Sequence, residues 1–318
     1  MNIAILGAGG IANALADTMN KMPEVNLYAV AARDLDRAKA FACKNGVEKA
    51  YGSYEEMLND DGVELVYIAT PHSHHYEHMK MCIEHGKNVL CEKAFTINAT
   101  QAREIKELAN AKHVYVAEAI WTRYMPSRSL INEVIESGII GEPKMLTANL
   151  HYVISHVERL VDPNLAGGAL LDVGIYCLNF ALMHFGTGIE KIESSVQMTD
   201  TGVDGMESLT VFYKDGKMAV LNAGMYSRSD RKGIIYGDKG YMVVENINNP
   251  QSISVYNVCD ELIKHIDVPS QISGYEYEII EAINSIKEGK IESESMPLSD
   301  TIHVMEIMDN IRKDWGFI

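Results

Sequence analysis

The feature that most constrains how this chain folds is a glycine-rich segment at residues 7–12, which lies between an apolar run and a stretch with apolar residues at helical spacing. It matches the pattern G-x-G-x-x-A, in which the first glycine permits a tight turn and the second lets a pyrophosphate approach the backbone. The N-terminus of the following helix supplies free N–H groups and a partial positive charge. The pattern predicts a dinucleotide-binding strand, turn and helix, with the cofactor beside Gly7, Gly9, Gly10 and Ile11.

Length and charge narrow the possibilities further. The chain has 318 residues, more than one ordinary core, and its 47% hydrophobic and 23% charged residues are those of a folded globular protein. A balance of 28 basic against 44 acidic residues gives a net charge of −16, which repels nucleic acid and anionic membranes over most of the surface. We therefore expect two domains and a small-molecule partner, with neither nucleic acid nor a membrane as a partner.

The cysteines indicate the compartment. Five of them, Cys43, Cys82, Cys91, Cys177 and Cys259, are scattered without a C-x-x-C pair, which suits neither a disulfide framework nor a zinc site. No basic start precedes the first apolar run, and charged residues or glycine interrupt each apolar stretch before about 18 residues. The sequence thus predicts a reduced, cytoplasmic setting, without a signal peptide or a membrane-spanning segment.

The end of the second predicted strand bears on the choice of cofactor. Arg33 stands where an NAD-specific fold places an acid on the adenosine ribose, and Arg37 follows one helical turn later. Two arginines in this position are able to bind a 2′-phosphate through charge-assisted hydrogen bonds, worth roughly 1.5–3 kcal/mol each. The pattern favours NADP. NAD stays open, because Asp34 or Asp36 at the helix start could contact the ribose instead.

Two further strand ends carry polar residues toward the same crevice, since ligands bind at the carboxyl ends of the strands in an open α/β sheet. The strand predicted at residues 64–69 runs into Thr70 and Pro71, and the strand at 88–92 ends in Glu92 and Lys93. We expect Lys93 to be positioned for chemistry and His75 to line the nicotinamide pocket. The histidines at positions 72, 74 and 75 have no cysteine or acid at ligand spacing, so no metal is predicted.

The next segments lead into the second domain. Trp121 and Arg123 follow a strand and are expected to meet a substrate, although interdomain packing is an equal alternative for Trp121. On the helix predicted after residues 166–168, Asp172, Tyr176 and Asn179 form a polar stripe beside an apolar one. Buried polar groups without hydrogen bonds are costly, so this stripe is expected to face a satisfied network or a ligand cavity.

The remaining pattern completes the predicted fold. From residue 189 short alternating strands follow one another, with a hairpin signal at residues 214–217, and two helices are predicted at 275–288 and 299–313. The predicted class is α/β, with an N-terminal Rossmann domain at 1–121 built on a doubly wound parallel sheet. The second domain, at 122–318, is predicted to be α+β with a large, mostly antiparallel open sheet, and its C-terminal helices are expected to pack back on the first domain.

In this order the motifs resemble the glucose-fructose oxidoreductase / inositol dehydrogenase (Gfo/Idh/MocA) family over nearly the whole chain. The resemblance rests on the glycine loop, Thr70-Pro71 with His75, Glu92-Lys93 and the segment 167–174. Longer strings at 31–34, 118–123 and 167–177 resemble the branch that contains dimeric dihydrodiol dehydrogenase, also described as an NADP-dependent D-xylose dehydrogenase. Ala94 departs from the family in replacing a proline, and Asn179 stands where inositol dehydrogenases carry an acid.

The resemblance implies an NAD(P)-dependent dehydrogenase that acts on a CH–OH group of a sugar, cyclitol or vicinal diol. It also implies a homodimer, or a higher oligomer, formed through the C-terminal sheet. Lys93 and Tyr176 would be the catalytic pair, with Asp172 beside them. The cofactor-binding residues expected from motif and resemblance are Gly7, Gly9, Gly10, Ile11, Arg33, Arg37, Thr70, Pro71, His75, Glu92, Lys93, Trp121 and Arg123. The expected substrate residues are Trp121, His156, Arg159, Asp172 and Tyr176.

A mechanism follows from these expectations. Tyr176 would take the hydroxyl proton while the neighbouring carbon gives hydride to the nicotinamide, and Lys93 would favour the phenolate and stabilise the developing alkoxide. A non-catalytic NADP(H)-binding sensor on the same fold is the main alternative. An enzyme acting on a phosphorylated or amino sugar is another. The presence of both Lys93 and Tyr176 favours an enzyme.

Overall fold

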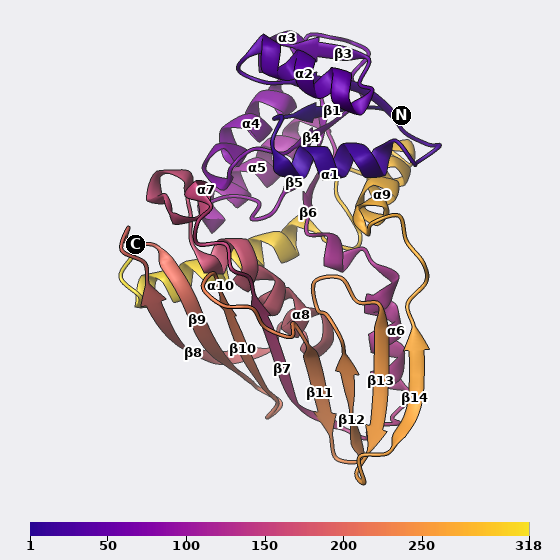
Figure 1. Cartoon of the computed structure of the whole chain (residues 1–318), viewed down its shortest axis with the longest axis vertical. Coiled ribbons are helices and arrows are strands. Elements are labelled where there is room, and N and C mark those ends of the chain that lie inside the picture. Colours follow the sequence, from indigo (N-terminus) through magenta and orange to yellow (C-terminus); the bar gives the residue numbers. More distant parts are fainter. Residues whose placement is uncertain (318) are drawn as a thin grey trace. The chain divides into compact units, whose positions relative to one another are not determined.

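The structure is a computed structural model that describes residues 1–317, and the chain divides into two compact units (Figure 1). The first unit comprises Met1–Trp121 and Gln271–Glu306, and the second comprises Thr122–Ser270 and the chain from Ile307 onward. Helix α10 (Leu298–Asp314) therefore begins in the first unit and ends in the second.

A six-stranded parallel sheet forms the centre of the first unit, in the order β3-β2-β1-β4-β5-β6. Its strands are β1 (Asn2–Leu6), β2 (Asn26–Ala31), β3 (Lys49–Tyr51), β4 (Leu65–Ile68), β5 (Asn88–Glu92) and β6 (Val116–Ala119). The helices of this unit are α1 (Gly10–Met19), α2 (Leu35–Asn45), α3 (Tyr54–Leu58), α4 (His72–Glu84), α5 (Ala99–Lys112) and α9 (Tyr275–Lys287). The strand order reverses between β1 and β4, which is where such a sheet binds its ligand.

The core of the first unit shows why these strands form. Ile3, Ile5, Leu65 and Leu90 are fully buried, as expected for strands covered on both faces by helices. Ile283 of α9 belongs to the same buried cluster. A segment far from the strands in sequence thus completes this core.

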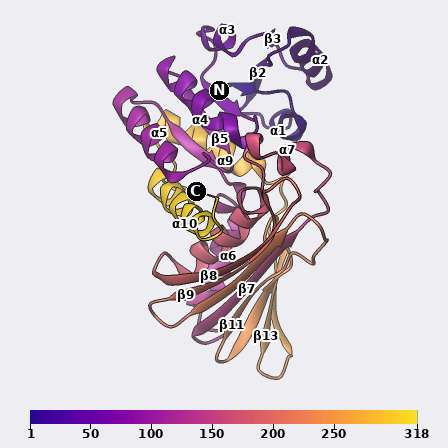
Figure 2. The same cartoon turned by 90° about the vertical axis from the view of Figure 1, so that its left-hand side faces the viewer.

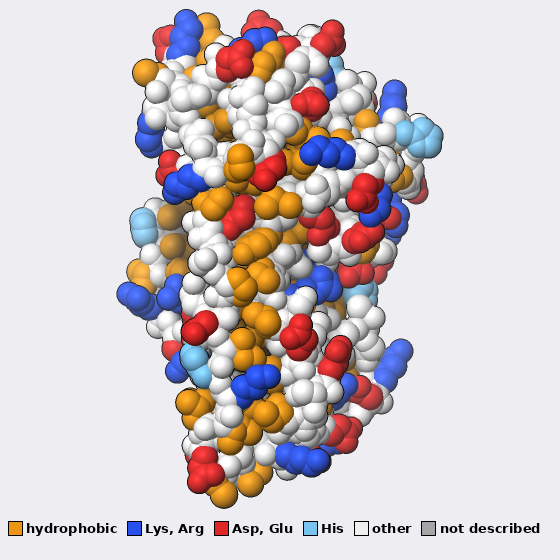
Figure 3. Space-filling model, turned by 90° about the vertical axis from the view of Figure 1, so that its right-hand side faces the viewer, with side chains coloured by type: hydrophobic (Ala, Val, Ile, Leu, Met, Phe, Trp, Pro, Cys, Tyr) orange, Lys and Arg blue, Asp and Glu red, His pale blue; other side chains and the backbone are white. Residues whose placement is uncertain are grey.

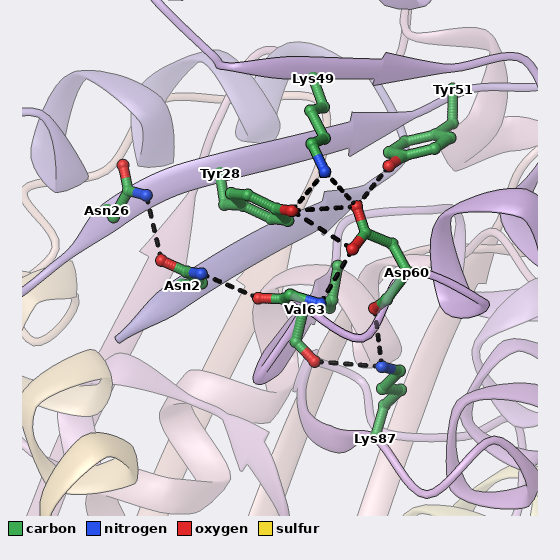
Figure 4. Close-up of polar contacts among 9 residues, drawn as sticks. Asn2, Asn26, Tyr28, Lys49, Tyr51, Asp60, Val63 and Lys87 are labelled. Carbon is green, nitrogen blue, oxygen red and sulfur yellow. Dashed lines mark hydrogen bonds and ion pairs between the residues drawn. The ribbon is translucent and has the colours of Figure 1, made fainter.

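Strand β3 was not predicted, because three residues are too few to show an alternating pattern. It is fixed to the sheet by the carboxylate of Asp60, which accepts hydrogen bonds from Lys49 Nζ (2.8 Å), Tyr51 Oη (2.5 Å) and Tyr28 Oη (3.1 Å), as Figure 4 shows. Lys87 Nζ donates to the carbonyl oxygen of Asp60 at 2.8 Å. These donors, Lys49 first, hold the pKa of Asp60 well below its ordinary value, so this ionised cluster holds the edge of the sheet in place.

The second unit is built on an eight-stranded sheet in the order β14-β13-β12-β11-β7-β10-β9-β8. Its strands are β7 (Pro143–His151), β8 (Ile189–Met198), β9 (Asp204–Tyr213), β10 (Met218–Gly224), β11 (Gly233–Gly237), β12 (Gly240–Val244), β13 (Ser252–Asn257) and β14 (Leu262–Asp267). Only the β7–β10 pair is parallel among the described strands of this sheet. The prediction of a parallel Rossmann sheet and a large, mostly antiparallel sheet is confirmed.

Helix α8 (Ile175–Phe185) lies against one face of the second sheet, where it contacts β7 and β10, and α6 (Pro126–Glu136) contacts α8. The described part of this unit places no helix on the other face (Figures 1 and 2). The remaining short helical segments here are α7 (Glu158–Val161) and the 3-10 turns η1 (Trp121–Arg123) and η2 (Pro163–Leu165). Leu146, Ala148 and Leu150 of β7 point toward the helices and are buried, while the residues between them are partly exposed. The sheet is therefore covered on one face only.

The helical stretch Pro163–Phe185 corrects one expectation, because by length and composition it is apolar enough to cross a membrane. The helical backbone continues through Asp172 and Gly174, whereas Gly167 and Gly168 lie outside regular helix. Of its most apolar window, 78% is buried inside the protein. The core helix of a globular domain has the same character.

Candidate active site

The glycine loop has the geometry that a pyrophosphate site requires. Gly7 has φ +107°, and a side chain there would press on the carbonyl oxygen of Ala69, 3.0 Å from an added Cβ. Helix α1 begins after Gly9, which offers no side-chain cap to its first N–H groups. An added Cβ on Gly10 would meet nothing within 4 Å. The loop thus leaves uncapped helix donors beside open space, an arrangement that suits an anionic group of a dinucleotide.

The residues after β2 divide between structural and binding roles. Asp34 caps α2, because its carboxylate accepts a hydrogen bond from the backbone N–H of Arg37 at 2.8 Å. Arg37 Nη2 donates to the carbonyl oxygen of Ala8 at 3.1 Å, so its guanidinium lies against the glycine loop. Arg33 is exposed at the strand end. The Asp34 carboxylate thus caps its own helix, while the guanidinium groups of Arg33 and Arg37 are the cations next to the glycine loop.

Lys93 follows β5 in a stretch that is otherwise buried. Every residue from Val89 to Thr96 is buried except Lys93, which is partly exposed. The peptide bond between Lys93 and Ala94 is cis. Phe95 donates its backbone N–H to Glu118 Oε1 at 3.1 Å, which ties the loop to β6. The lysine is thus the one side chain that this anchored segment presents outward.

His75 lies beneath this loop. Its side chain is fully buried, and its ring nitrogens lie 2.8 Å from two backbone oxygens, Nδ1 from that of Ala94 and Nε2 from that of Thr70. Burial lowers the pKa of His75 to about 4. The imidazole thus contacts the loop after β4 through Thr70 and the loop after β5 through Ala94, next to Lys93.

Two other residues predicted for the site are also engaged within the first unit. Glu92 is buried and accepts a hydrogen bond from the Tyr67 hydroxyl at 2.9 Å. Trp121 is 8% exposed and stacks on Tyr275 with ring centroids 4.4 Å apart and an interplanar angle of 18°. This ring contact lies within the first unit, so it is not the packing between domains that the sequence left as an equal alternative.

In the second unit the polar stripe lies where the helix changes its winding. Residues Leu170–Gly174 form a π-helical turn (η3), a geometry frequent at functional sites, and α8 continues from Ile175. Asp172 in this turn is buried and pairs with Arg159 Nη1 at 3.2 Å. Between Gly168 and Leu182 every residue is buried except Tyr176, which is partly exposed. The turn therefore presents a phenol outward beside a paired carboxylate.

Asn179 and Arg123 form the buried part of the stripe. Arg123 is 4% exposed, and its Nε donates to Asn179 Oδ1 at 2.7 Å. Asn179 Nδ2 donates in turn to the carbonyl oxygen of Ile175 at 2.9 Å. The predicted satisfied network exists, and Arg123 belongs to it. His156 lies exposed in the loop after β7.

Two acids that the sequence analysis did not single out support the π-helical turn from β9. Asp204 Oδ2 accepts the backbone N–H of Leu170 at 2.5 Å. Glu207 is 3% exposed and neither carboxyl oxygen has a partner among the described residues, while a Cβ on Gly174 would clash with this carboxyl. The glycine of the D-x-G motif is thus explained by a residue 33 positions later. Alternation along β9 was the only local signal that could have indicated an inward acid.

We expect Glu207→Gln to stabilise the protein at neutral pH. Burial, followed by the charge of Asp204, raises the pKa of Glu207 well above its ordinary value of 4.5. Folding therefore takes up a proton above pH 4.5, so the free energy of unfolding falls as the pH rises toward the folded-state pKa. Glutamine does not titrate, and the variant should gain about 1 kcal/mol at pH 8 and nothing near pH 4.

Thermal unfolding of the variant and the wild type at both pH values measures this effect. Glu190→Gln, at an exposed position of β8, is the matched control and should show no difference. An equal gain at pH 4 and pH 8 would contradict the ionisation account.

The described residues, 1–317, contain no group of three or more His, Cys, Asp or Glu side chains placed to hold a metal ion.

Comparison with known proteins agrees with this geometry. Residues 1–119 match the model of an oxidoreductase family with an NAD-binding Rossmann fold, and residues 129–243 match the GFO/IDH/MocA C-terminal domain. The chain is 35% identical to trans-1,2-dihydrobenzene-1,2-diol dehydrogenase of Mus musculus, covering 98% of this chain and 96% of the relative. The Homo sapiens protein of the same name is 33% identical over the same shares.

Solved structures show the same fold. A 3-ketoreductase from Actinomadura kijaniata, in complex with NADP and TDP-benzene, superposes with a TM-score of 0.90 at 22% identity, covering 98% of this chain and 97% of that one. A levoglucosan dehydrogenase in complex with NADH and L-sorbose gives 0.87 at 18% identity, covering 99% and 96%.

The Rossmann sheet with its open glycine loop defines an oxidoreductase that uses a nicotinamide dinucleotide. The chain belongs to the Gfo/Idh/MocA oxidoreductase family. The family, the fold class and the enzyme class predicted from the sequence are thereby confirmed.

Proposed function

We propose that this protein is an NADP-preferring dehydrogenase that oxidises a CH–OH group of a vicinal diol or a sugar. One observation carries the proposal: Lys93 and Tyr176 are each the only partly exposed side chain in a buried stretch. The relatives named dihydrodiol dehydrogenases, 33–35% identical over nearly the whole chain, support the substrate class. Variants of the 3-ketoreductase with a substituted lysine or a substituted tyrosine are among the similar structures.

The chemistry assigned to these residues follows from their functional groups. Bound NADP⁺ supplies the hydride acceptor. Tyr176 takes the substrate hydroxyl proton as general base, and the Lys93 ammonium favours the phenolate and stabilises the alkoxide as it develops. Asp172, held by Arg159 at 3.2 Å, is assigned the role of orienting the lysine. The hydride acceptor is thus the cofactor, the proton acceptor is Tyr176 and the group that stabilises the alkoxide is Lys93.

We expect Arg33→Ala to weaken NADP⁺ more than NAD⁺. A single charge-assisted contact to the 2′-phosphate is worth roughly 1.5–3 kcal/mol, so KM for NADP⁺ should rise roughly ten- to a hundredfold or more, while KM for NAD⁺ stays within about twofold. Initial rates over a range of each cofactor measure the two constants. Lys39→Ala, which removes an exposed cation of α2, the helix that follows Arg33, should change neither constant. A similar rise for both cofactors would contradict the 2′-phosphate assignment.

The function is tested by initial rates with NADP⁺ and NAD⁺ over a cyclic trans-dihydrodiol, D-xylose, D-glucose and myo-inositol. Turnover that prefers NADP⁺ and one of these classes supports the proposal and identifies the class. Tight NADP(H) binding without turnover of any of them would favour the sensor alternative. A preference for a phosphorylated or amino sugar added to the panel would redirect the substrate assignment.

We also propose that the protein is a homodimer formed through the uncovered face of the second sheet. Tyr236, Tyr241 and Tyr256 are directly opposed on three neighbouring strands of that face, with ring centroids 6.0 Å and 5.0 Å apart. Aromatic residues are enriched at interface cores. Other partly buried apolar side chains, such as Met145, Ile234 and Val243, alternate onto the same face.

Sedimentation equilibrium tests the dimer. We expect a dimer that Tyr241→Glu converts to a monomer, because a charge would be buried unpaired at the interface. Val258→Glu is a suitable control, since Val258 is 73% exposed in the turn between β13 and β14. Figure 3 shows that hydrophobic and charged side chains also lie next to one another elsewhere on the surface. A monomeric wild type at micromolar concentration would contradict the proposal. A cytoplasmic location stays a prediction from the scattered cysteines.

A further inference from the structure

Three buried titratable groups of the first unit form a hydrogen-bonded chain behind the Lys93 segment. The hydroxyl of Tyr67, on β4, lies 2.9 Å from Glu92 Oε1, at the end of β5, and 2.9 Å from Glu278 Oε1, on α9. Tyr67 and Glu278 are fully buried and Glu92 is 8% exposed. Two carboxyl groups therefore share one phenol in the interior, which is unfavourable if both are ionised.

The number of available protons limits the protonation state of this hydrogen-bonded chain. A phenol has one proton and can donate it to only one of the two carboxylates. The second 2.9 Å contact is a hydrogen bond only if that other carboxyl is protonated and donates to the phenol oxygen. The chain thus holds at least two protons, and at most one of its two carboxyl groups is ionised.

The surroundings assign the charge to Glu92. Glu278 Oε2 is buried without a partner among the described residues, and an ionised carboxylate there would be uncompensated. Tyr115 interacts electrostatically with Glu278 and with Glu281, and neither of these two residues adds a positive charge. Burial, followed by the charge of Glu92, raises the pKa of Glu278 well above its ordinary value. Glu92 lies at the strand end, followed directly by the partly exposed Lys93.

We propose that Glu278 is a permanently protonated acid that donates to Tyr67, which donates to Glu92, and that this chain keeps Glu92 ionised and fixed as a positioning group for the Lys93 segment. The proposal rests on the proposed function in assigning catalysis to Lys93. Its structural part, the proton on Glu278, stands independently of turnover. Glu278 and Tyr67 act through Glu92 and are positioning residues themselves.

The first test reads the protons directly. A protonated carboxylic acid has an infrared C=O stretch that a carboxylate lacks, and at pH 7 the wild type should show this band. Glu278→Gln should remove part of it and Glu92→Gln none. Loss of the band in Glu92→Gln but not in Glu278→Gln would overturn the assignment. Glu207→Gln, which removes the other buried acid expected to be protonated, calibrates the size of one acid's contribution.

The second test reads the consequence for catalysis. In Tyr67→Phe the Glu92 carboxylate loses the hydrogen bond from the phenol and protonates more readily, so the acid limb of the kcat/KM profile should move up by about one pH unit. Glu278→Gln keeps a donor toward the Tyr67 oxygen and should retain the wild-type profile. Tyr115→Phe is a matched control, because it removes a buried hydroxyl that has no partner among the described residues.

The outcomes distinguish failure of the positioning role from failure of the proposed dehydrogenase function. A Tyr67→Phe profile identical to the wild type, or an equal shift in Tyr115→Phe, would overturn the positioning role. A wild type without turnover would instead overturn the proposed function, while the infrared result would still decide where the proton lies.

Discussion

Tyr176→Phe is expected to lower kcat/KM about 10²- to 10⁴-fold, the usual contribution of a positioned general base. The substitution removes one oxygen atom from a partly exposed ring and leaves the buried side of α8 unchanged. Substrate and NADP⁺ binding should therefore change little. The loss should appear in single-turnover hydride transfer, followed by NADPH fluorescence.

A matched control is available in the same unit. Tyr213 is buried and its hydroxyl has no partner among the described residues, so Tyr213→Phe removes a similar atom away from the predicted site and should retain near-full turnover. If Tyr176→Phe also retained it, the assignment of the base would be wrong.

Lys93→Met is expected to lower kcat about 10²- to 10³-fold, because it removes the charge assigned to stabilise the developing alkoxide. Methionine keeps an unbranched side chain at the one position of the loop that is not buried, so the unfolding temperature should stay close to the wild type. Lys93→Arg, which retains the charge with a different donor geometry, should lose less than Lys93→Met.

Steady-state rates at saturating cofactor measure this effect. Lys112→Met, at the exposed last residue of α5, is the control for the loss of one surface charge and should leave kcat unchanged. A Lys93→Met enzyme with unchanged kcat and a raised KM for NADP⁺ would show that Lys93 binds the cofactor and does not take part in the chemical step.

Local patterns predicted much of the fold. Gly7 has the positive φ that the fingerprint requires, and strands β1, β4 and β5 lie close to their predicted ranges. These features depend on neighbours in sequence, namely hydrophobic periodicity and turn chemistry, which a single sequence contains. Strand β3 lacked such a signal, because its three residues are held by pairing with β2 and by the carboxylate of Asp60, which lies outside the strand.

The site divides in the same way. The sequence identified Lys93 and Tyr176 from motifs, but it did not indicate that Arg123 would be buried on Asn179 or that Trp121 would stack on Tyr275. Those contacts pair residues more than 50 positions apart. No local pattern distinguishes a cation that binds a ligand from one that satisfies a buried amide.

The sequence by itself therefore determined the dinucleotide-binding fold and the family, and it predicted the residues assigned to the chemistry, because each depends on a short motif with its own physical requirement. Only the tertiary structure decided the supporting groups. Glu207 lies beneath the D-x-G turn, and Glu278 shares the Tyr67 phenol with Glu92. A sequence does not indicate which partner a carboxyl group has or whether it is protonated. Packing against distant strands and helices excludes water from the group, and so determines its partner and its protonation state.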